Sequence, residues 1–307
     1  MSILEVENFS VRFKQYGAGL KKMDQIAISN VSISLEEGEI LAVVGASGSG
    51  KSLLAHGILG ILPSNAKTSG IIKYKGELLT LKRQKALRGK EIALVPQSVN
   101  FLDPLMRVGK QVRASANSGD RAALQRKVFK RYHLKKEVET MYPFQLSGGM
   151  ARRALLSTAM VSGANVIIAD EPTPGLDPVV IKEALTNFRE FANQGCAVML
   201  ITHDIESALH IADKIAVFYA GTTVEVAPVE DFAGQGEALR HPYTKALWRA
   251  LPQNDFIPIP GSQPRSNELP KGCSFAPRCP IATSKCEGVM PDIREVRNGW
   301  VRCDHAY

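Results

Sequence analysis

Apolar and polar residues follow two patterns along this chain, and each pattern predicts a different element. Alternating residues at 3–13 and 28–35 are typical of half-buried strands. Short apolar runs bounded by glycine or charged residues predict buried strands at 38–45, 92–95, 166–169, 197–202 and 214–219. Segments with apolar residues at helical spacing, such as 51–62, lie between these runs. Strands that alternate with helices predict parallel βαβ units and an α/β core.

Two parts of the chain depart from this pattern. Between about residues 98 and 160 the strand-like runs disappear and charged residues increase, which predicts a helical insertion. Beyond His241, repeated prolines interrupt any long element, and four of the five cysteines lie in the last 35 residues. We therefore expect a main domain over residues 1–245, with a helical subdomain at about 98–160, and a C-terminal extension over residues 246–307.

Composition narrows the class of protein without selecting a function. The 307 residues are 45% hydrophobic and 22% charged, which excludes a disordered, collagen-like or coiled-coil chain. The net charge of +8 suits an anionic partner such as a nucleotide, a nucleic acid or an acidic membrane. No apolar run reaches the roughly 18 residues of a spanning helix, and the first residues lack the features of a signal peptide. We expect an intracellular chain whose cysteines do not form disulfides.

A phosphate-binding loop is the clearest chemical feature. Residues 45–52 read Gly-Ala-Ser-Gly-Ser-Gly-Lys-Ser and match G-x-x-x-x-G-K-[ST] between a predicted strand and a predicted helix. Glycines let successive N–H groups point at phosphate oxygens, and the helix start adds partial positive charge. Lys51 would contact the β- and γ-phosphates, and the Ser52 hydroxyl would bind Mg²⁺. The predicted phosphate contacts are Gly45, Ser47, Gly48, Ser49, Gly50, Lys51 and Ser52.

A pair of carboxylates follows the apolar run at 166–169. Asp170 stands at the predicted strand's end, where a Walker B aspartate holds Mg²⁺ through water. Glu171 follows directly and can polarise the water that attacks the γ-phosphate. A strand ending in Asp-Glu is common by itself, but its position after a phosphate-binding loop makes this pair specific.

The residues between these motifs carry a family resemblance. Leu146-Ser147-Gly148-Gly149-Met150 would be a turn or a helix cap in isolation. With the loop before it and the carboxylates after it, the arrangement resembles the ATP-binding cassette (ABC) superfamily over roughly residues 2–245. The resemblance implies an α/β P-loop NTPase core with an antiparallel β subdomain and a helical insertion subdomain, followed here by the small cysteine-containing C-terminal extension.

The resemblance also implies roles for individual residues. Gln97 matches the Q-loop glutamine, a catalytic and Mg²⁺-associated position, and Asp177 lies in the D-loop sequence Gly-Leu-Asp. His203 matches the switch histidine that contacts the γ-phosphate, although a lone histidine after a strand is otherwise a surface or capping residue. Phe13 lies where the family stacks an aromatic ring on adenine, with Tyr16 as a rival. Ser147, Gly148 and Gly149 would bind the ATP held by a second cassette.

The C-terminal sequence narrows the resemblance further. His241-Pro242-Tyr243-Thr244 and Cys273-Ser-Phe-Ala-Pro-Arg-Cys279-Pro look like the tail of the oligopeptide, dipeptide and nickel importer subfamily. Three features differ from the usual family pattern. Ala151-Arg152-Arg153 replaces Arg-Gln-Arg, Thr173-Pro174-Gly175 replaces Thr-Thr-Ala, and phenylalanine replaces tyrosine at position 13.

The four C-terminal cysteines form a candidate metal site. Cys273, Cys279, Cys286 and Cys303 are spaced C-x5-C-x6-C-x16-C, without the C-x2-C pairs usual for zinc. Spacing alone leaves an iron–sulfur cluster, zinc and no metal equally open. The resemblance favours a [4Fe–4S] cluster, because dipeptide-importer ATPases of this subfamily can carry one on this tail. Cys196 stands apart and is interpreted as a small buried hydrophobe.

Taken as a whole, the resemblance implies an ATP- and Mg²⁺-dependent ATPase that powers import. Its expected partners are a second ABC ATPase subunit, favoured as a paralogue, two membrane permease subunits and an extracytoplasmic substrate-binding protein, with no nucleic acid. The expected location is the cytoplasmic face of the cell membrane. Peptides, nickel and metal–opine complexes all stay open as cargo. The alternatives are a non-transport ABC ATPase of repair, translation or iron–sulfur assembly, a P-loop kinase or GTPase, and an exporter.

Overall fold

The structure, a computed structural model, describes residues 2–16, 22–266 and 268–306. These residues form two compact units. The first unit comprises Leu35–Ile40 and Thr80–Thr202, and the second comprises Ser2–Ser34, Leu41–Leu79 and His203–Tyr307. The chain therefore passes between the units several times, and residues far apart in sequence share each core.

The described elements follow the order of the chain. The strands are β1 Ser2–Tyr16, β2 Lys22–Glu36, β3 Ile40–Gly45, β4 Ala66–Tyr74, β5 Glu77–Leu78, β6 Ile92–Val95, β7 Val166–Asp170, β8 Ala197–Thr202, β9 Lys214–Tyr219, β10 Thr222–Pro228, β11 Arg294–Val296 and β12 Gly299–Val301. The α-helices are α1 Lys51–Leu59, α2 Leu81–Leu87, α3 Val108–Ser115, α4 Arg121–Arg131, α5 Gly148–Met160, α6 Pro178–Asn193, α7 Ile205–Leu209, α8 Pro242–Arg249 and α9 Ser284–Gly288.

The first unit is built on three parallel strands. β7 pairs with β6 on one side and with β8 on the other. Every residue of β7 and β8 is buried, which explains why their sequences are continuous apolar runs rather than alternating ones. This confirms the parallel α/β core that the apolar runs predict.

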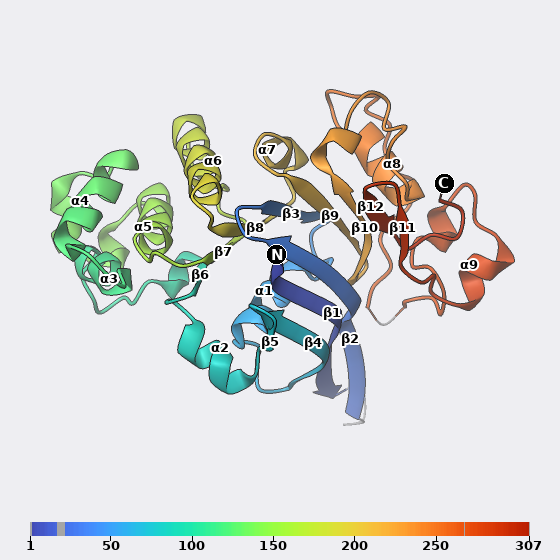
Figure 1. Ribbon diagram of the computed structural model, residues 1–307, viewed down its shortest axis with the longest axis horizontal. Coiled ribbons are helices and arrows are strands. Elements are labelled where there is room, and N and C mark those ends of the chain that lie inside the picture. Colours follow the sequence, from blue (N-terminus) through green and yellow to red (C-terminus); the bar gives the residue numbers. More distant parts are fainter. Residues whose placement is uncertain (1, 17–21, 267, 307) are drawn as a thin grey trace. The chain divides into compact units, whose positions relative to one another are not determined.

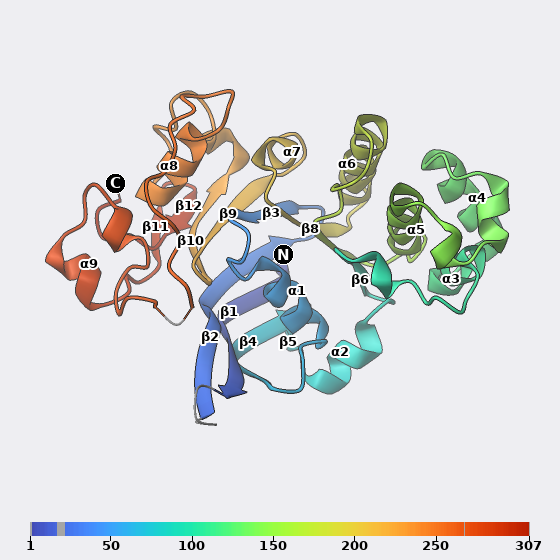
Figure 2. The same ribbon diagram turned by 180° about the vertical axis from the view of Figure 1, so that it is seen from behind.

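Helices α3, α4 and α5 of the first unit pack on one another (Figure 2). They occupy the segment predicted as a helical insertion. A bidentate ion pair joins α4 to α6, with Arg131 donating to the two Glu190 carboxylate oxygens at 2.7 and 3.0 Å. The buried Tyr132 hydroxyl lies 2.8 Å from the Asn187 side-chain oxygen. Polar contacts as well as packing thus attach the helical insertion to α6.

The second unit contains an antiparallel sheet in the order β2-β1-β4-β5 (Figure 1). A second group of strands runs β11-β12-β10-β9-β3, in which β3 and β9 are parallel and the other pairs are antiparallel. β12 pairs with β10, placing Val301 opposite Glu225. The end of the chain is therefore part of this unit's sheet.

Some elements differ from their predicted limits. The helix predicted at 51–62 ends at Leu59. Strands β4, β10, β11 and β12 were not predicted, because most are short or polar on one face. The predicted domain boundary at residue 245 falls within α8.

Candidate functional site

The phosphate-binding loop joins β3 to α1 in the second unit, as its sequence predicts. The N-terminal turn of α1 holds no acidic residue, and the partial positive charge of a helix start favours an anion. Lys51 is buried, and its ammonium donates to the carbonyl oxygens of Gly45 and Ala46 at 2.7 and 3.1 Å. The cation that the chemistry needs is thereby held against the loop backbone.

Glycine is required at the first position of this loop. Gly45 has φ of 152°, and a Cβ there would lie 2.3 Å from the Phe218 carbonyl oxygen of the neighbouring strand. Any side chain would force β3 away from β9 at the point where the loop begins. Ser47 and Gly48 of the same loop are exposed, whereas Ser49 is fully buried. The loop is thus anchored at its ends and accessible in its middle.

The two carboxylates lie at the end of β7 in the first unit. Asp170 closes the strand and Glu171 follows it, and both are buried. Glu171 has φ of 47°, a left-handed conformation that non-glycine residues rarely adopt. Its backbone N–H donates to the Ile201 carbonyl at 2.9 Å. Strained backbone of this kind collects at functional sites, where it directs one side chain.

Arg152 connects two of the predicted functional segments. From the first turns of α5 its guanidinium donates to the carbonyl oxygens of Pro96 and Glu171, at 3.2 and 3.4 Å, and to that of Gln97. Burial lowers the pKa of Arg152, and the negative charges of Glu171 and Asp170 oppose this effect. Arg152 departs from the usual family pattern, and the sequence pattern predicts no role for it. The feature of the sequence that indicates a role for Arg152 is its positive charge at a position where the family usually has glutamine.

The Ser-Gly-Gly motif is exposed at the start of a helix. Ser147 is the N-cap of α5, and its hydroxyl accepts from the Met150 N–H at 3.3 Å. A Cβ at Gly148 would meet nothing within 4 Å, whereas one at Gly149 would lie 3.5 Å from the Gly175 carbonyl oxygen. The motif therefore lies beside the D-loop and presents open backbone.

Asp177 of the D-loop caps the next helix. Its carboxylate accepts from the Val180 N–H at 3.1 Å at the start of α6. Part of this side chain's hydrogen-bonding capacity is thus used by the helix. Gln97 follows β6 and is exposed. Within the first unit, Arg152 hydrogen-bonds to the backbone of both Gln97 and Glu171. The close approach of Gly149 to Gly175 places the Ser-Gly-Gly motif beside the D-loop.

Two predicted residues lie in the second unit with the phosphate-binding loop. His203 follows β8 directly and is exposed, one residue before the N-cap of α7. Phe13 is half-buried on β1, opposite Ala66 of β4. The side chain of Tyr16, the rival to Phe13, lies outside the described part of the structure.

The four C-terminal cysteines lie in one folded module. The backbone N–H of Cys273 donates to the Cys286 carbonyl at 2.8 Å, and the Cys286 sulfur lies 3.4 Å from His305 Nε2, two residues after Cys303. A Cβ at Gly272 would lie 2.1 Å from the Cys286 carbonyl oxygen, so this close approach requires glycine. Contacts between distant segments thus join three of the cysteine positions.

The electrostatics of these thiols show that they influence one another. Burial raises the pKa of Cys273, and the charges of Cys303 and Cys279 raise it further. Burial likewise raises the pKa of Cys303, with smaller contributions from Cys279 and Cys286. Backbone N–H groups of Phe275 and His305 act in the opposite direction, because they favour the thiolates of Cys273 and Cys303, respectively.

No single-ion metal site accompanies these thiols. Across residues 2–16, 22–266 and 268–306, no three His, Cys, Asp or Glu side chains are grouped closely enough to hold one metal ion. The same described residues include no helix that is both long and apolar enough to cross a membrane. Cys196, as expected, is buried, and burial raises its pKa to about 12.

Comparison with protein families matches the two parts of the chain separately. The ABC transporter family matches residues 28–174, and the C-terminal region of oligopeptide/dipeptide transporters matches residues 224–286. The chain is 34% identical to the dipeptide transport ATP-binding protein of Bacillus subtilis, over 94% of this chain and 90% of that one. It is 34% identical to the oligopeptide transport ATP-binding protein of Escherichia coli, over 91% and 87%.

Solved structures give the same fold. An ATP-binding subunit of an ABC transporter superposes with a TM-score of 0.63 at 23% identity, covering 75% of this chain and 92% of that one. A dimeric ATP-binding cassette bound to ADP and phosphate superposes with a TM-score of 0.65 at 23% identity, covering 74% and 98%. With the motifs and the two family matches, these similarities show that the chain belongs to the ATP-binding subunits of ABC transporters, in the oligopeptide and dipeptide importer subfamily.

Proposed function

We propose that this chain hydrolyses ATP to drive uptake of dipeptides or oligopeptides through membrane permease subunits. The observation that carries the proposal is the pairing of a complete phosphate-binding loop with the C-terminal region of peptide transporters in one chain. Relatives named for dipeptide and oligopeptide transport, similar over nine-tenths of the chain, favour peptides over nickel or metal–opine complexes. The oligopeptide-type tail also disfavours repair, translation and iron–sulfur assembly cassettes.

The proposed roles follow the chemistry of each side chain. The loop backbone and Lys51 bind the phosphates, while Ser52, Gln97 and Asp170 hold Mg²⁺, whose charge offsets that developing on the phosphoryl group. Glu171 orients and deprotonates the attacking water, and His203 contacts the γ-phosphate. Phe13 stacks on adenine.

Hydrolysis is proposed to require two cassettes. Ser147 caps a helix whose first residue, Gly148, is exposed, and such a helix start binds a phosphate well. In the proposed pair this helix start contacts the γ-phosphate held by the other cassette, together with Gly148, Gly149 and Asp177. A paralogous subunit is the proposed second cassette. The dimeric cassette of similar fold supports pairing in general.

The proposed surface for the permeases lies after the Q-loop. Phe101 and Leu105 are 55% and 87% exposed, and the loop that carries them is held by Gln111, whose amide donates to the Asp103 and Met106 carbonyl oxygens. Rigid, exposed apolar residues of this kind mark interaction sites. Binding there would place the chain on the cytoplasmic face of the membrane, with the substrate-binding protein on the opposite side.

The test is purification of the tagged chain from membranes, followed by peptide uptake in vesicles. We expect two integral-membrane subunits and a second ATPase to co-purify, and uptake to stop when Lys51 is replaced by alanine. A chain that never co-purifies with an integral-membrane protein would contradict the proposal. Exposed Lys285, replaced by alanine, serves as the control variant.

We also propose that Cys273, Cys279, Cys286 and Cys303 hold a [4Fe–4S] cluster. The donor set fits, because it offers four mutually interacting thiols and backbone N–H groups that favour their thiolates. Each cysteine of such a cluster binds a different iron, so the sulfurs lie farther apart than around one zinc ion. In this arrangement, residues 246–307 act as a distinct cluster-binding extension.

Iron and sulfide analysis of anaerobically purified protein tests this assignment. We expect about four irons per chain and a broad absorbance near 400 nm, both lost when Cys279 is replaced by serine. Protein with neither iron nor that absorbance would exclude the cluster. The Cys196→Ser variant provides the matched control, since Cys196 lies outside the module.

A further inference from the structure

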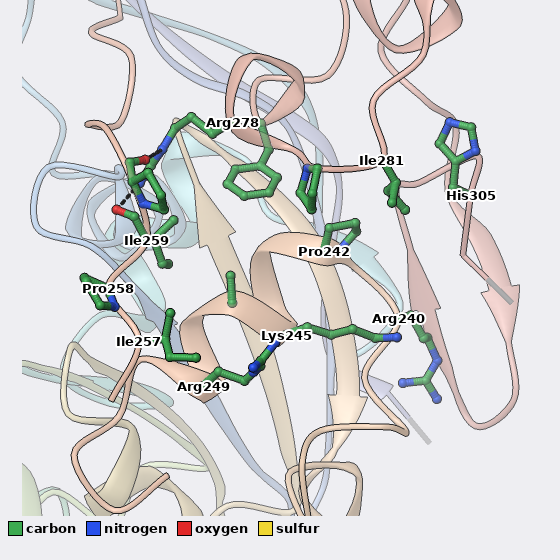
Figure 3. Close-up of a pocket in the computed structure, with 14 residues that line it drawn as sticks. Arg240, Pro242, Lys245, Arg249, Ile257, Pro258, Ile259, Arg278, Ile281 and His305 are labelled. Carbon is green, nitrogen blue, oxygen red and sulfur yellow. Dashed lines mark hydrogen bonds between the residues drawn. The ribbon is translucent and has the colours of Figure 1, made fainter. Parts of the chain in front are cut away.

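A cavity of about 460 Å³ lies in the second unit, between α8, the proline-rich linker and the cysteine module. Figure 3 shows Pro242, Lys245 and Arg249 on α8, Ile257 to Ile259 along the linker, and Ile281 and His305 on the opposite wall. This volume falls in the range of small-molecule sites. Neither the nucleotide motifs nor the cysteines line this cavity, so the functions described above do not explain it.

The walls of the cavity are apolar. Ile257, Ile259, Ile281 and Phe275 line it with four prolines and Ala246. Ile257 and Ile281 are 49% and 48% exposed. Large aliphatic side chains left half in water around a concave surface favour an apolar ligand, because a ligand removes their surface from water.

The charged groups of the cavity all have one sign. The fourteen described lining residues include four positively charged side chains, Arg240, Lys245, Arg249 and Arg278, and none is acidic. Two of these cations form ion pairs with acidic residues that do not line the cavity. Arg240 pairs with Glu225 and Asp231 at 3.3 and 2.7 Å, and Arg249 pairs with Asp255 at 2.5 Å.

Arg278 is held differently, by neutral partners. It donates to the carbonyl oxygens of Ile259, Pro260 and Gly261 and to the Tyr219 hydroxyl, at 2.7 to 3.2 Å (Figure 3 draws the bonds to the linker). Its guanidinium carbon also lies 5.9 Å from the centre of the Tyr219 ring and 5.8 Å from that of Phe275. These contacts orient the guanidinium on the wall without neutralising its charge.

We infer that this cavity binds a small amphipathic carboxylate, an apolar body that carries one carboxylate group. The isoleucine and proline walls would cover the apolar body, and Arg278 would pair with the carboxylate. A medium-chain fatty acid and a short apolar peptide with a free C-terminus share this chemistry.

Calorimetric titration of the full chain with octanoate tests the inference. We expect saturation with a dissociation constant below about 1 mM. Octanol and octyltrimethylammonium should bind at least about tenfold more weakly, because they lack the carboxylate. Absence of saturation by octanoate, or equal binding of all three molecules, would overturn the inference.

Variants locate the binding. Ala246→Phe fills the cavity from α8 without changing charge, and Ile257→Trp does so from the exposed linker in case the first variant fails to fold. Each should abolish octanoate binding while ATP still binds at the phosphate-binding loop, none of whose residues lines the cavity. Arg278→Gln should weaken octanoate binding at least about tenfold, with octanol binding unchanged. The control Lys285→Gln removes an exposed cation of the same module that does not line the cavity.

A second titration distinguishes a peptide ligand from a fatty-acid ligand. Trileucine and its C-terminal amide are compared with octanoate on the same protein. Tighter binding of trileucine than of its amide or octanoate identifies a peptide ligand, whereas tighter binding of octanoate identifies an acyl carboxylate. Binding that persists in the folded cavity-filled variants contradicts the site in both cases.

Discussion

Single residues in this cassette are held in conformations that a sequence pattern does not reveal. Glu171 adopts a left-handed backbone directly after a fully buried strand, and a hydrogen bond from its N–H to Ile201 fixes that conformation. Such strain persists only where the surrounding structure stabilises it. Its presence at the proposed water-orienting carboxylate supports a role that depends on the direction of this side chain.

Replacing Glu171 by glutamine should separate ATP binding from hydrolysis. Glutamine keeps the size of the side chain but cannot accept the proton of the attacking water, so we expect turnover to fall by about 10²- to 10⁴-fold. ATP affinity should change less than about twofold, because the phosphates are held elsewhere. Wild-type steady-state hydrolysis by this variant in the assembled complex would refute the assignment. Exposed Glu206→Gln is the control.

Arg152 should act as a positioning residue for the same step. Its hydrogen bonds to the Gln97 and Glu171 carbonyl oxygens hold two active segments, so Arg152→Gln should lower kcat by about tenfold, equivalent to about 1.4 kcal/mol, with KM unchanged. Arg152→Lys should recover part of this loss. A purely structural role would instead lower thermal stability with kcat intact. Exposed Arg126→Gln on α4 is the matched control.

At the scale of elements, one buried polar group organises the start of the C-terminal extension. Glu225 of β10 is fully buried and accepts from the backbone N–H groups of Arg240 and His241, at 2.9 and 2.8 Å. His241 is the N-cap of α8, its Nδ1 accepting from the Tyr243 N–H at 3.0 Å. The His-Pro-Tyr sequence thus begins a helix by capping it and ties that helix to the sheet.

This cap predicts a pH dependence of stability. Burial lowers the pKa of His241 from 6.5 to about 3, so between these values the unfolded chain binds a proton that the folded chain does not. The free energy of unfolding should therefore fall as pH drops below about 6.5, with a limiting slope of about 1.4 kcal/mol per pH unit from this group.

Denaturant unfolding between pH 4 and 8 measures this effect. His241→Asn keeps a capping oxygen but cannot titrate, so the difference in stability between wild type and variant should shrink as pH falls. Comparing the two proteins cancels the contributions of other groups such as Glu225. A difference that stays constant with pH would contradict the prediction. Exposed His210→Asn should leave the pH profile unchanged.

At the scale of the whole molecule, the Ser-Gly-Gly motif at the start of α5 is proposed to bind a phosphate held by a second cassette. Ser147 and Gly148 at the start of α5 are exposed, and Gly148 has open space where a side chain would stand. The proposed second cassette supplies the missing phosphate.

Gly148→Asp should block this pairing without disturbing the fold. Aspartate fits the open space and is favoured at a helix start, but its charge repels the γ-phosphate of the partner. In a Glu171→Gln background, ATP should join this chain to its proposed paralogous partner in a cassette dimer on size-exclusion chromatography, and Gly148→Asp should abolish that dimer. Isosteric Gly148→Asn should weaken the dimer less. Equal dimerisation of both variants would show that this helix start does not meet a phosphate.

The sequence by itself determined the nucleotide chemistry, the alternation of strands and helices, and the family. These properties depend on local patterns, because a phosphate-binding loop is a continuous segment and a buried strand must be apolar. Tertiary structure alone decided that Arg152 bridges the Gln97 and Glu171 segments, that Glu171 is left-handed, and that β12 joins β10. It also decided that the linker and the cysteine module enclose a cationic, apolar cavity against α8. Contacts between residues far apart in the chain create these features, and no local spacing encodes them.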